Sequence, residues 1–266
     1  MVIIPRKIFD QMSPKALTEA ENSTENFNVI KFLKGMNETD RLQWLKKNAA
    51  WVGTGSSRIT FILNDMTALK IAHNKRGIAQ NKQEYQNTVD ENGHGKYTCF
   101  SEIYDVDKDD WEMLRVEAAS VAKESDFKHS LGLSYAGEAI MIPVALNICK
   151  GNVKRLMISD ILIGRVIDTL SEMSVSDKKE FLELFNSPRI TEIIYRISKG
   201  KPKPGSEANL ASIYKFYNEN GLKKMMPPDL TNDENWGTVW RNGINQLIII
   251  DSGFSEDVWE RYYTTA

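Results

Sequence analysis

Two neighbouring apolar runs, at residues 58–63 and 67–72, constrain the fold more than any other feature of the sequence. Apolar side chains recur at every second position in the first run, and β-branched residues are frequent in both, which predicts strands. Asn64-Asp65 between the runs favours a turn. We therefore predict an antiparallel pair of strands, with Lys70 in the middle of the second.

Lys70 is flanked by Leu69 and Ile71, so it lies in an apolar part of this strand. A lysine that faces the core of a protein must be paired with an anion. A nucleotide phosphate and a carboxylate both meet this need, and Glu84, in a segment predicted to be helical, is one such carboxylate. The alternatives are a lysine on an edge strand and a helix glutamate that both face solvent.

A glycine-rich segment, Gly53-Thr54-Gly55-Ser56-Ser57, precedes the first of these strands. A dinucleotide-binding loop is disfavoured because Arg58 stands at the third glycine position and a strand follows instead of a helix. A Walker-type loop is excluded because the Gly-Lys-Ser/Thr step is absent. A turn between antiparallel strands fits best, either as a plain hairpin or as a loop whose glycines let the backbone approach phosphates.

The rest of the chain divides into helical and strand segments. Residues 13–50 are predicted to be helical, with Asn37 as the N-cap of a helix over residues 38–47. The Asn242-Gly243 pair predicts a late hairpin. Further predictions are a polar helix at 75–90, strands at 98–106 and 111–117, and mainly helices after Ala118, including an isoleucine stripe at 190–197 and a helix that ends near Gly221.

Two acids and an amide lie on either side of the late hairpin. Asp229 and Asn235 share the loop before it, and Asp251 follows the apolar run at residues 247–250. Oxygen donors that converge from a loop and from the end of a buried strand suit a hard cation. The alternative is a simple turn at Asp251-Ser252-Gly253.

Composition limits the classes of protein that remain. The 266 residues suffice for one large domain or two small lobes, and 41% apolar and 26% charged residues are usual for a globular protein. The formal net charge of −2 gives no reason to expect a nucleic-acid partner, and no apolar run is long enough to span a membrane. Cys99 and Cys149 match no metal-ligand spacing, so we expect reduced thiols and a cytoplasmic location.

The glycine-rich turn, the strand lysine, the helix glutamate, the Asp…Asn loop and Asp251-Ser252-Gly253 follow an order that resembles the protein-kinase-like superfamily. The likeness covers residues 51–120 and 208–254 and is strongest to compact serine/threonine kinase-like proteins encoded by bacteriophages. It implies an α+β, bilobal fold: a helical N-terminal extension at residues 1–50, a small antiparallel-sheet N-lobe at residues 51–120, and a reduced helical C-lobe at residues 121–266.

The same resemblance implies an enzyme that uses ATP and Mg²⁺. Asn235 and Asp251 would bind magnesium, and Asp229 would accept the proton of the substrate hydroxyl. The implied ATP-binding residues are Gly53 and Gly55 over the phosphates with Ser56 beside them, Lys70 at the α- and β-phosphates, Glu84 as the partner that orients Lys70, and Leu114, Val116 and Glu117 in a hinge at residues 113–117 whose backbone meets the adenine.

Several departures from the family pattern bear on activity. Arg58 replaces the third glycine, and Pro227-Pro228 stands where the family has His-Arg. Asp229 and Asn235 are six positions apart where the family has five. Because 13 residues follow Gly253, we expect neither an activation segment nor the later helices that form the peptide platform of the family.

Three functions therefore stand as hypotheses. The first is phosphoryl transfer from ATP to a Ser/Thr hydroxyl of a host protein. The second is a pseudokinase-like module that binds or sequesters a host protein, and the third is a small-molecule phosphotransferase. The implied partners are ATP and a host protein, without nucleic acid or membrane, in the host cytoplasm if a bacteriophage encodes the chain; a homo-oligomer stays open.

Overall fold

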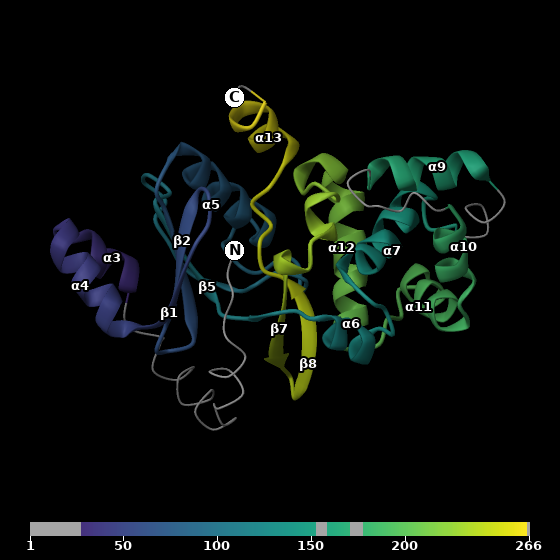
Figure 1. The fold of residues 1–266 in the computed structure, drawn as a ribbon, viewed down its shortest axis with the longest axis horizontal. Helices are drawn as coiled ribbons and strands as arrows, with labels where there is room; N and C mark the ends of the chain where they lie inside the picture. The colour runs from purple at the N-terminus through teal and green to yellow at the C-terminus, as the bar shows by residue number, and fades with distance from the viewer. Residues whose placement is uncertain (1–27, 153–158, 171–177, 265–266) are drawn as a thin grey trace. The chain divides into compact units, whose positions relative to one another are not determined.

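The computed structural model describes residues 28–152, 159–170 and 178–264 (Figure 1). The chain forms two compact units and passes from one to the other several times. The first comprises Met1–Lys96, Ser101–Val121 and Val258–Ala266, and the second comprises Tyr97–Phe100 and Ala122–Asp257. Antiparallel strands and helices together confirm the predicted α+β class.

An antiparallel sheet of five strands forms the centre of the first unit, in the order β1-β2-β3-β5-β4. The strands are β1 (Ala49–Thr54), β2 (Arg58–Leu63), β3 (Thr67–Ala72), β4 (Ile103–Val106) and β5 (Met113–Glu117). The predicted pair at residues 58–72 is confirmed as β2 and β3, with Thr60 opposite Lys70. The apolar alternation therefore sets the register that centres Lys70 in the sheet.

The predicted strand at residues 98–106 is too long, because β4 begins only at Ile103. Residues 97–100 belong to the second unit. There the backbone N–H of Ile249 donates to the carbonyl of Cys99 at 2.7 Å. A contact between segments far apart in the sequence thus removes these residues from the sheet of the first unit.

Two N-terminal helices pack on this sheet. The helix α3 (Val29–Lys34) contacts β4 and β5, and α4 (Glu38–Asn48) contacts β2. Asn37 caps α4 as predicted, because its side chain accepts a backbone N–H of the first turn at 2.9 Å. Leu33 of α3 shares an apolar cluster with Leu69 of β3 and Met113 of β5. The predicted helical residues 13–27 lie outside the described residues.

The helix α5 (Lys75–Thr88) packs against β3, β4 and β5, which confirms the predicted polar helix (Figure 1). Asn74 caps it by accepting the backbone N–H of Gly77 at 3.0 Å. Beyond the C-terminal helix α13 (Glu256–Tyr262), the ring of Tyr263 lies 4.7 Å from the guanidinium of Arg76, and its hydroxyl accepts from Gln80 at 3.4 Å. The end of the described chain therefore holds α5.

The second unit is mainly helical, as predicted. Its helices are α6 (Glu124–Ser130), α7 (Ala136–Ile148), α9 (Asp160–Thr169), α10 (Lys178–Asn186), α11 (Pro188–Ser198) and α12 (Ser206–Asn220), with 3-10 turns at Leu222–Lys224, Asp229–Thr231 and Asp233–Asn235. The helices α9, α11 and α12 pack on α7, in which ten of 13 residues are buried. A helix buried on all sides has no amphipathic period, so its bounds were not predicted.

Two predicted helical features of this unit are confirmed. The isoleucines of α11 are all buried, which is the stripe predicted at residues 190–197. The helix α12 ends at Gly221, whose φ of 80° lies in the left-handed region that favours glycine at a helix end. None of the helices in the described parts of the chain has both the length and the apolar character needed to cross a membrane.

The late hairpin is also confirmed, as β7 (Trp236–Arg241) and β8 (Ile244–Ile249). Asn242 and Gly243 have φ values of 53° and 75°, as a two-residue hairpin turn requires. Trp236 pairs with Ile249 at the open end of the hairpin. Asp251 therefore follows directly on a buried strand.

The short strand β6 (Ser120–Val121) ends the middle segment of the first unit.

The units divide the chain differently from the predicted domains at several places, including residues 97–100, which belong to the second unit. The predicted boundary after residue 120 lies one residue from the division after Val121. Residues 28–50 and 258–264 belong to the first unit, although the prediction assigned them to an extension and to the C-lobe. The reason is packing, because α3 and α4 cover the sheet and Tyr263 contacts α5.

The close approach of α5 to the sheet gives a testable prediction. A Cβ at Gly77 would overlap the carbonyl oxygen of Ser57 and lie 2.9 Å from the Cβ of Ala72. We expect Gly77→Ala to displace α5 and to lower the free energy of unfolding by about 1–3 kcal/mol in urea denaturation. Gly95→Ala is the control, since an added Cβ there meets nothing within 4 Å. Equal losses in both variants would contradict this account.

Candidate functional site

Lys70 and Glu84 form a buried ion pair in the first unit. Lys70 on β3 and Glu84 on α5 are each 3% exposed, and Nζ lies 2.5 Å from Oε1. Lys70 pairs in register with Thr60 of β2 on one side and Leu114 of β5 on the other. Lys70 is therefore not on an edge strand, and the carboxylate suggested by the sequence is its partner.

Arg58 shares the same carboxylate. Its Nη1 lies 2.7 Å from Oε2 of Glu84 and 3.3 Å from Oδ1 of Asn81. Asn81 is fully buried and donates to the carbonyls of Trp111 and Glu112 at 3.0 Å and 3.1 Å. The residue that replaces the third glycine of the family pattern is thus a second cation at Glu84.

Sequence analysis missed this role of Arg58, although a signal for it exists. Arg58 lies two positions before Thr60, and Thr60 is opposite Lys70. Residues two apart on a strand share a face, as do residues directly opposite on an antiparallel neighbour. The register of β2 against β3 therefore places Arg58 and Lys70 on one face of the sheet.

Hydrogen bonds tie α5, and His73 just before it, to the turn between β1 and β2. The hydroxyl of Ser57 donates to Oε1 of Gln80 at 2.5 Å, and the backbone N–H of His73 donates to the carbonyl of Ser57 at 3.1 Å. Gly77, one turn before Gln80, allows the helix to lie against this carbonyl. The position of Glu84 along the sheet is set by these contacts, one and two turns earlier in the same helix.

The glycine-rich segment forms the predicted turn between antiparallel strands. A Cβ at Gly53 would overlap the indole of Trp51, so packing alone explains this glycine. The backbone N–H of Gly55 donates to the carbonyl of Arg58 at 2.8 Å. The carbonyl of Ser56 accepts from Asn74 at 3.1 Å. These contacts are those of a hairpin turn, and phosphate binding by the turn stays a prediction.

The predicted hinge at residues 113–117 coincides with β5. Leu114 and Val116 lie within β5, which pairs with β3 on one side and with β4 on the other. The backbone groups of an internal strand are hydrogen-bonded in the sheet, and contact of this segment with an adenine stays a prediction. Glu117 ends the strand, and its own N–H donates to the carbonyl of Glu102 at 2.8 Å.

In the second unit, the loop with Asp229 and Asn235 consists of two 3-10 turns, Asp229–Thr231 and Asp233–Asn235. Asn232, between the turns, caps the second one by accepting the backbone N–H of Glu234 at 3.0 Å. The two turns accommodate the spacing of six positions that departs from the family pattern.

Asn235 links Asp229 to the segment that carries Asp251. Its side-chain Nδ2 donates to the backbone carbonyl of Asp229 at 2.7 Å. The backbone carbonyl of Asn235 accepts the N–H of Ile250 at 2.9 Å. Oδ1 of Asp251 accepts the N–H of Gly253 at 3.3 Å. The structure therefore brings the three predicted residues of this unit together through the backbone.

Two neighbours of this group have structural roles that sequence analysis did not assign. Oδ1 of Asp233 accepts the N–H of Ala136 at the start of α7, at 2.7 Å. The hydroxyl of Tyr217 is buried and has no hydrogen-bond partner among the described residues. Burial raises the pKa of Tyr217 well above its ordinary value, and the neighbouring Cys99 and Asp229 raise it further. Tyr217 therefore stays a neutral phenol.

Comparisons of the chain with protein-family models, with curated proteins and with solved structures found no match. The assignment therefore depends on the chemistry of the residues. Ammonium and guanidinium groups such as those of Lys70 and Arg58 are common partners of phosphate. Asn235 and Asp251 offer the oxygen donors that Mg²⁺ prefers, and Oδ1 is the candidate atom of Asn235 because Nδ2 bonds to Asp229. Each group lies within its own unit.

The shared carboxylate predicts unequal costs for its removal and for removal of one cation. Glu84→Gln takes the anion from both Lys70 and Arg58, so we expect the free energy of unfolding to fall by about 3–5 kcal/mol. Lys70→Met leaves the ion pair of Glu84 with Arg58 and should cost clearly less. Guanidinium denaturation of both variants measures the difference, and an equal loss would contradict the shared-carboxylate arrangement.

Proposed function

We propose that the protein binds ATP with Mg²⁺ and transfers the terminal phosphoryl group to a Ser/Thr hydroxyl of a protein. The proposal includes the finer fold: a reduced, bilobal protein-kinase-like fold, with the first unit as the small antiparallel-sheet lobe and the second as the helical lobe. The observation that carries it is the buried ion pair between a lysine on an internal strand and a glutamate on the following helix.

Lys70 would hold the α- and β-phosphates. In protein kinases a lysine on the third strand does this, and a helix glutamate orients it. Lys70 and Glu84 have the same placement here, on β3 and on α5. Arg58 adds a second cation at this carboxylate, and we propose that it keeps Glu84 in place while Lys70 engages a phosphate. Gly53, Gly55 and Ser56 of the turn would lie over the phosphates.

Asn235 and Asp251 would hold the magnesium ion, which neutralises charge on the phosphates when it is bound. Asp229 would accept the proton of the substrate hydroxyl. The support is that one short network, from the carbonyl of Asp229 through Asn235 to the N–H of Ile250, sets the positions of all three. Catalysis of this kind needs positioned charges more than covalent chemistry, so such a network has a direct use.

A catalytically weak, pseudokinase-like module is the second candidate, and one observation favours it. The glycine at position 53 is explained by the indole of Trp51, and Arg58 occupies the place of the third glycine. A turn built in this way would bind phosphates less closely than a glycine-rich loop. The module would then bind a protein partner without turnover. Among the described residues, no feature favours a small-molecule acceptor over a protein.

Binding of nucleotide is tested by thermal stability. We expect Mg·ATP at about 100 times its Kd to stabilise the wild type by roughly 2.7 kcal/mol and to raise its melting temperature. Asp251→Ala should abolish the shift because a magnesium ligand is lost. Asp233→Asn is the matched control and should keep the shift, since the Asp233 carboxylate is bonded to Ala136. No shift in the wild type would refute nucleotide binding.

Turnover is tested with labelled ATP. Lys70→Ala should fold and should reduce phosphoryl transfer by about 10²–10³-fold, because charge stabilisation of the transition state is lost. Incubation with a host lysate and with a panel of small hydroxylated molecules separates protein from small-molecule acceptors. Unchanged transfer by Lys70→Ala would remove Lys70 from the mechanism, and binding of Mg·ATP without any transfer would favour the pseudokinase-like module.

A further inference from the structure

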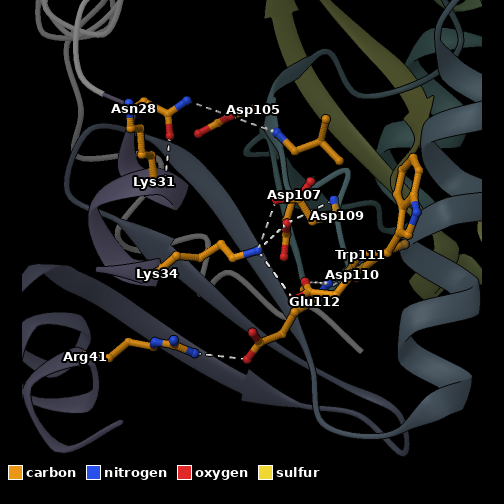
Figure 2. Close-up of polar contacts among 12 residues, drawn as sticks. Asn28, Lys31, Lys34, Arg41, Asp105, Asp107, Asp109, Asp110, Trp111 and Glu112 are labelled. Carbon is orange, nitrogen blue, oxygen red and sulfur yellow. Dashed lines mark hydrogen bonds and ion pairs between the residues drawn. The ribbon is translucent and has the colours of Figure 1, made fainter. Parts of the chain in front are cut away.

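The turn between β4 and β5 gathers three carboxylates in the first unit (Figure 2). Asp107, Asp110 and Glu112 each offer an oxygen, and these oxygens all lie within 4.8 Å of one another. Backbone bonds close the turn, as the N–H of Trp111 donates to the carbonyl of Asp107 at 2.9 Å. Acidic residues in a turn are common on protein surfaces, so the proximity alone does not make a site.

A second observation distinguishes this turn. The side chain of Asp107 is 2% exposed, and its Oδ2 is buried without a hydrogen-bond partner among the described residues. A buried carboxylate oxygen without a donor is costly, and its usual partner is a hydrogen-bond donor or a metal ion.

Two basic side chains already lie at this cluster. The ammonium of Lys34 from α3 is 2.7 Å from Oδ1 of Asp107, 3.4 Å from Oδ2 of Asp110 and 3.8 Å from Oδ2 of Asp109 (Figure 2). Arg41 of α4 pairs with Glu112 at 3.0 Å. Lys34 is 31% exposed and ends a flexible side chain, so it can leave the cluster without movement of the backbone.

We propose that this turn binds a hard divalent cation of the size of Ca²⁺ through Asp107, Asp110 and Glu112, in exchange with the ammonium of Lys34. Ca²⁺ takes oxygen ligands at about 2.4 Å, so two ligands of one ion can be at most about 4.8 Å apart. Each pair of the three oxygens is within this limit. Mg²⁺ forms shorter bonds, at about 2.1 Å, and needs a tighter cluster of ligands. We therefore expect the turn to bind Mg²⁺ more weakly than Ca²⁺.

This site goes beyond the proposed function and uses none of its residues. The ammonium of Lys34 links α3 to the turn. A bound cation would neutralise the carboxylates of the turn in its place, and this link would be lost. The cluster offers few protein ligands and a competing ammonium, so water completes the coordination shell. We expect a Kd on the order of 10⁻⁴–10⁻³ M for Ca²⁺.

Calorimetric titration of the full chain with CaCl₂, without nucleotide, tests the proposal. Asp110→Asn and Glu112→Gln should each weaken binding at least about tenfold. Asp109→Asn is the matched control: it removes the same charge from the same turn, but Asp109 is 94% exposed and is not one of the three ligands. It should change the Kd less than about twofold. Lys34→Met should tighten binding, because the competing ammonium is gone.

Terbium gives an independent readout, since Tb³⁺ resembles Ca²⁺ and is sensitised by a nearby indole. Trp111 lies between two of the ligands in sequence, so Trp111→Phe should reduce the luminescence without weakening Ca²⁺ binding. Asp251→Ala, which removes the proposed magnesium ligand, should bind Ca²⁺ as the wild type does. The proposal is overturned by any of three results. The wild type shows no heat of Ca²⁺ binding, Asp109→Asn and Asp110→Asn lose the same Ca²⁺ affinity, or Lys34→Met binds Ca²⁺ more weakly than the wild type.

Discussion

The carboxylate of Glu84 is the interaction on which the first unit depends. Two cations, from β2 and β3, meet one anion from α5 in the interior, where a charge without a partner costs several kcal/mol. The pairing of these charges determines which face of α5 lies toward the sheet. The contacts of Gly77 and Gln80 determine the position of the helix along the sheet. Charge pairing and close packing therefore act on the same helix, and neither leaves it freedom to shift.

Local patterns predicted those elements whose neighbours in space are also neighbours in sequence. The alternation of residues 58–72 fixed β2 and β3, and Asn242-Gly243 fixed the hairpin of the second unit. The failures involve long-range contacts. Residues 98–100 resemble a strand but pair with Ile249, far away in the chain, and α7 is buried on all sides, so it has no period to detect.

The candidate site shows the same division. Lys70 and Glu84 were predictable because an apolar strand makes a lysine conspicuous and its need for an anion is physical. Arg58 was missed because its partner follows from register, which a single strand does not reveal. The adenine contact at Leu114 and Val116 stays a prediction, and the structure places both residues in β5, between β3 and β4.

The contact of Tyr263 with Arg76 and Gln80 has a consequence for folding in the cell. Most of the first unit precedes Ala122–Asp257 of the second unit in the chain, and the residues that return to α5 come only after that segment. During synthesis, α5 therefore lacks its contacts with Tyr263 until residues 122–257 of the second unit have been made. The last packing contacts of the first unit thus form only after most of the second unit has been synthesised, and the order of segments along the chain alone links the two events.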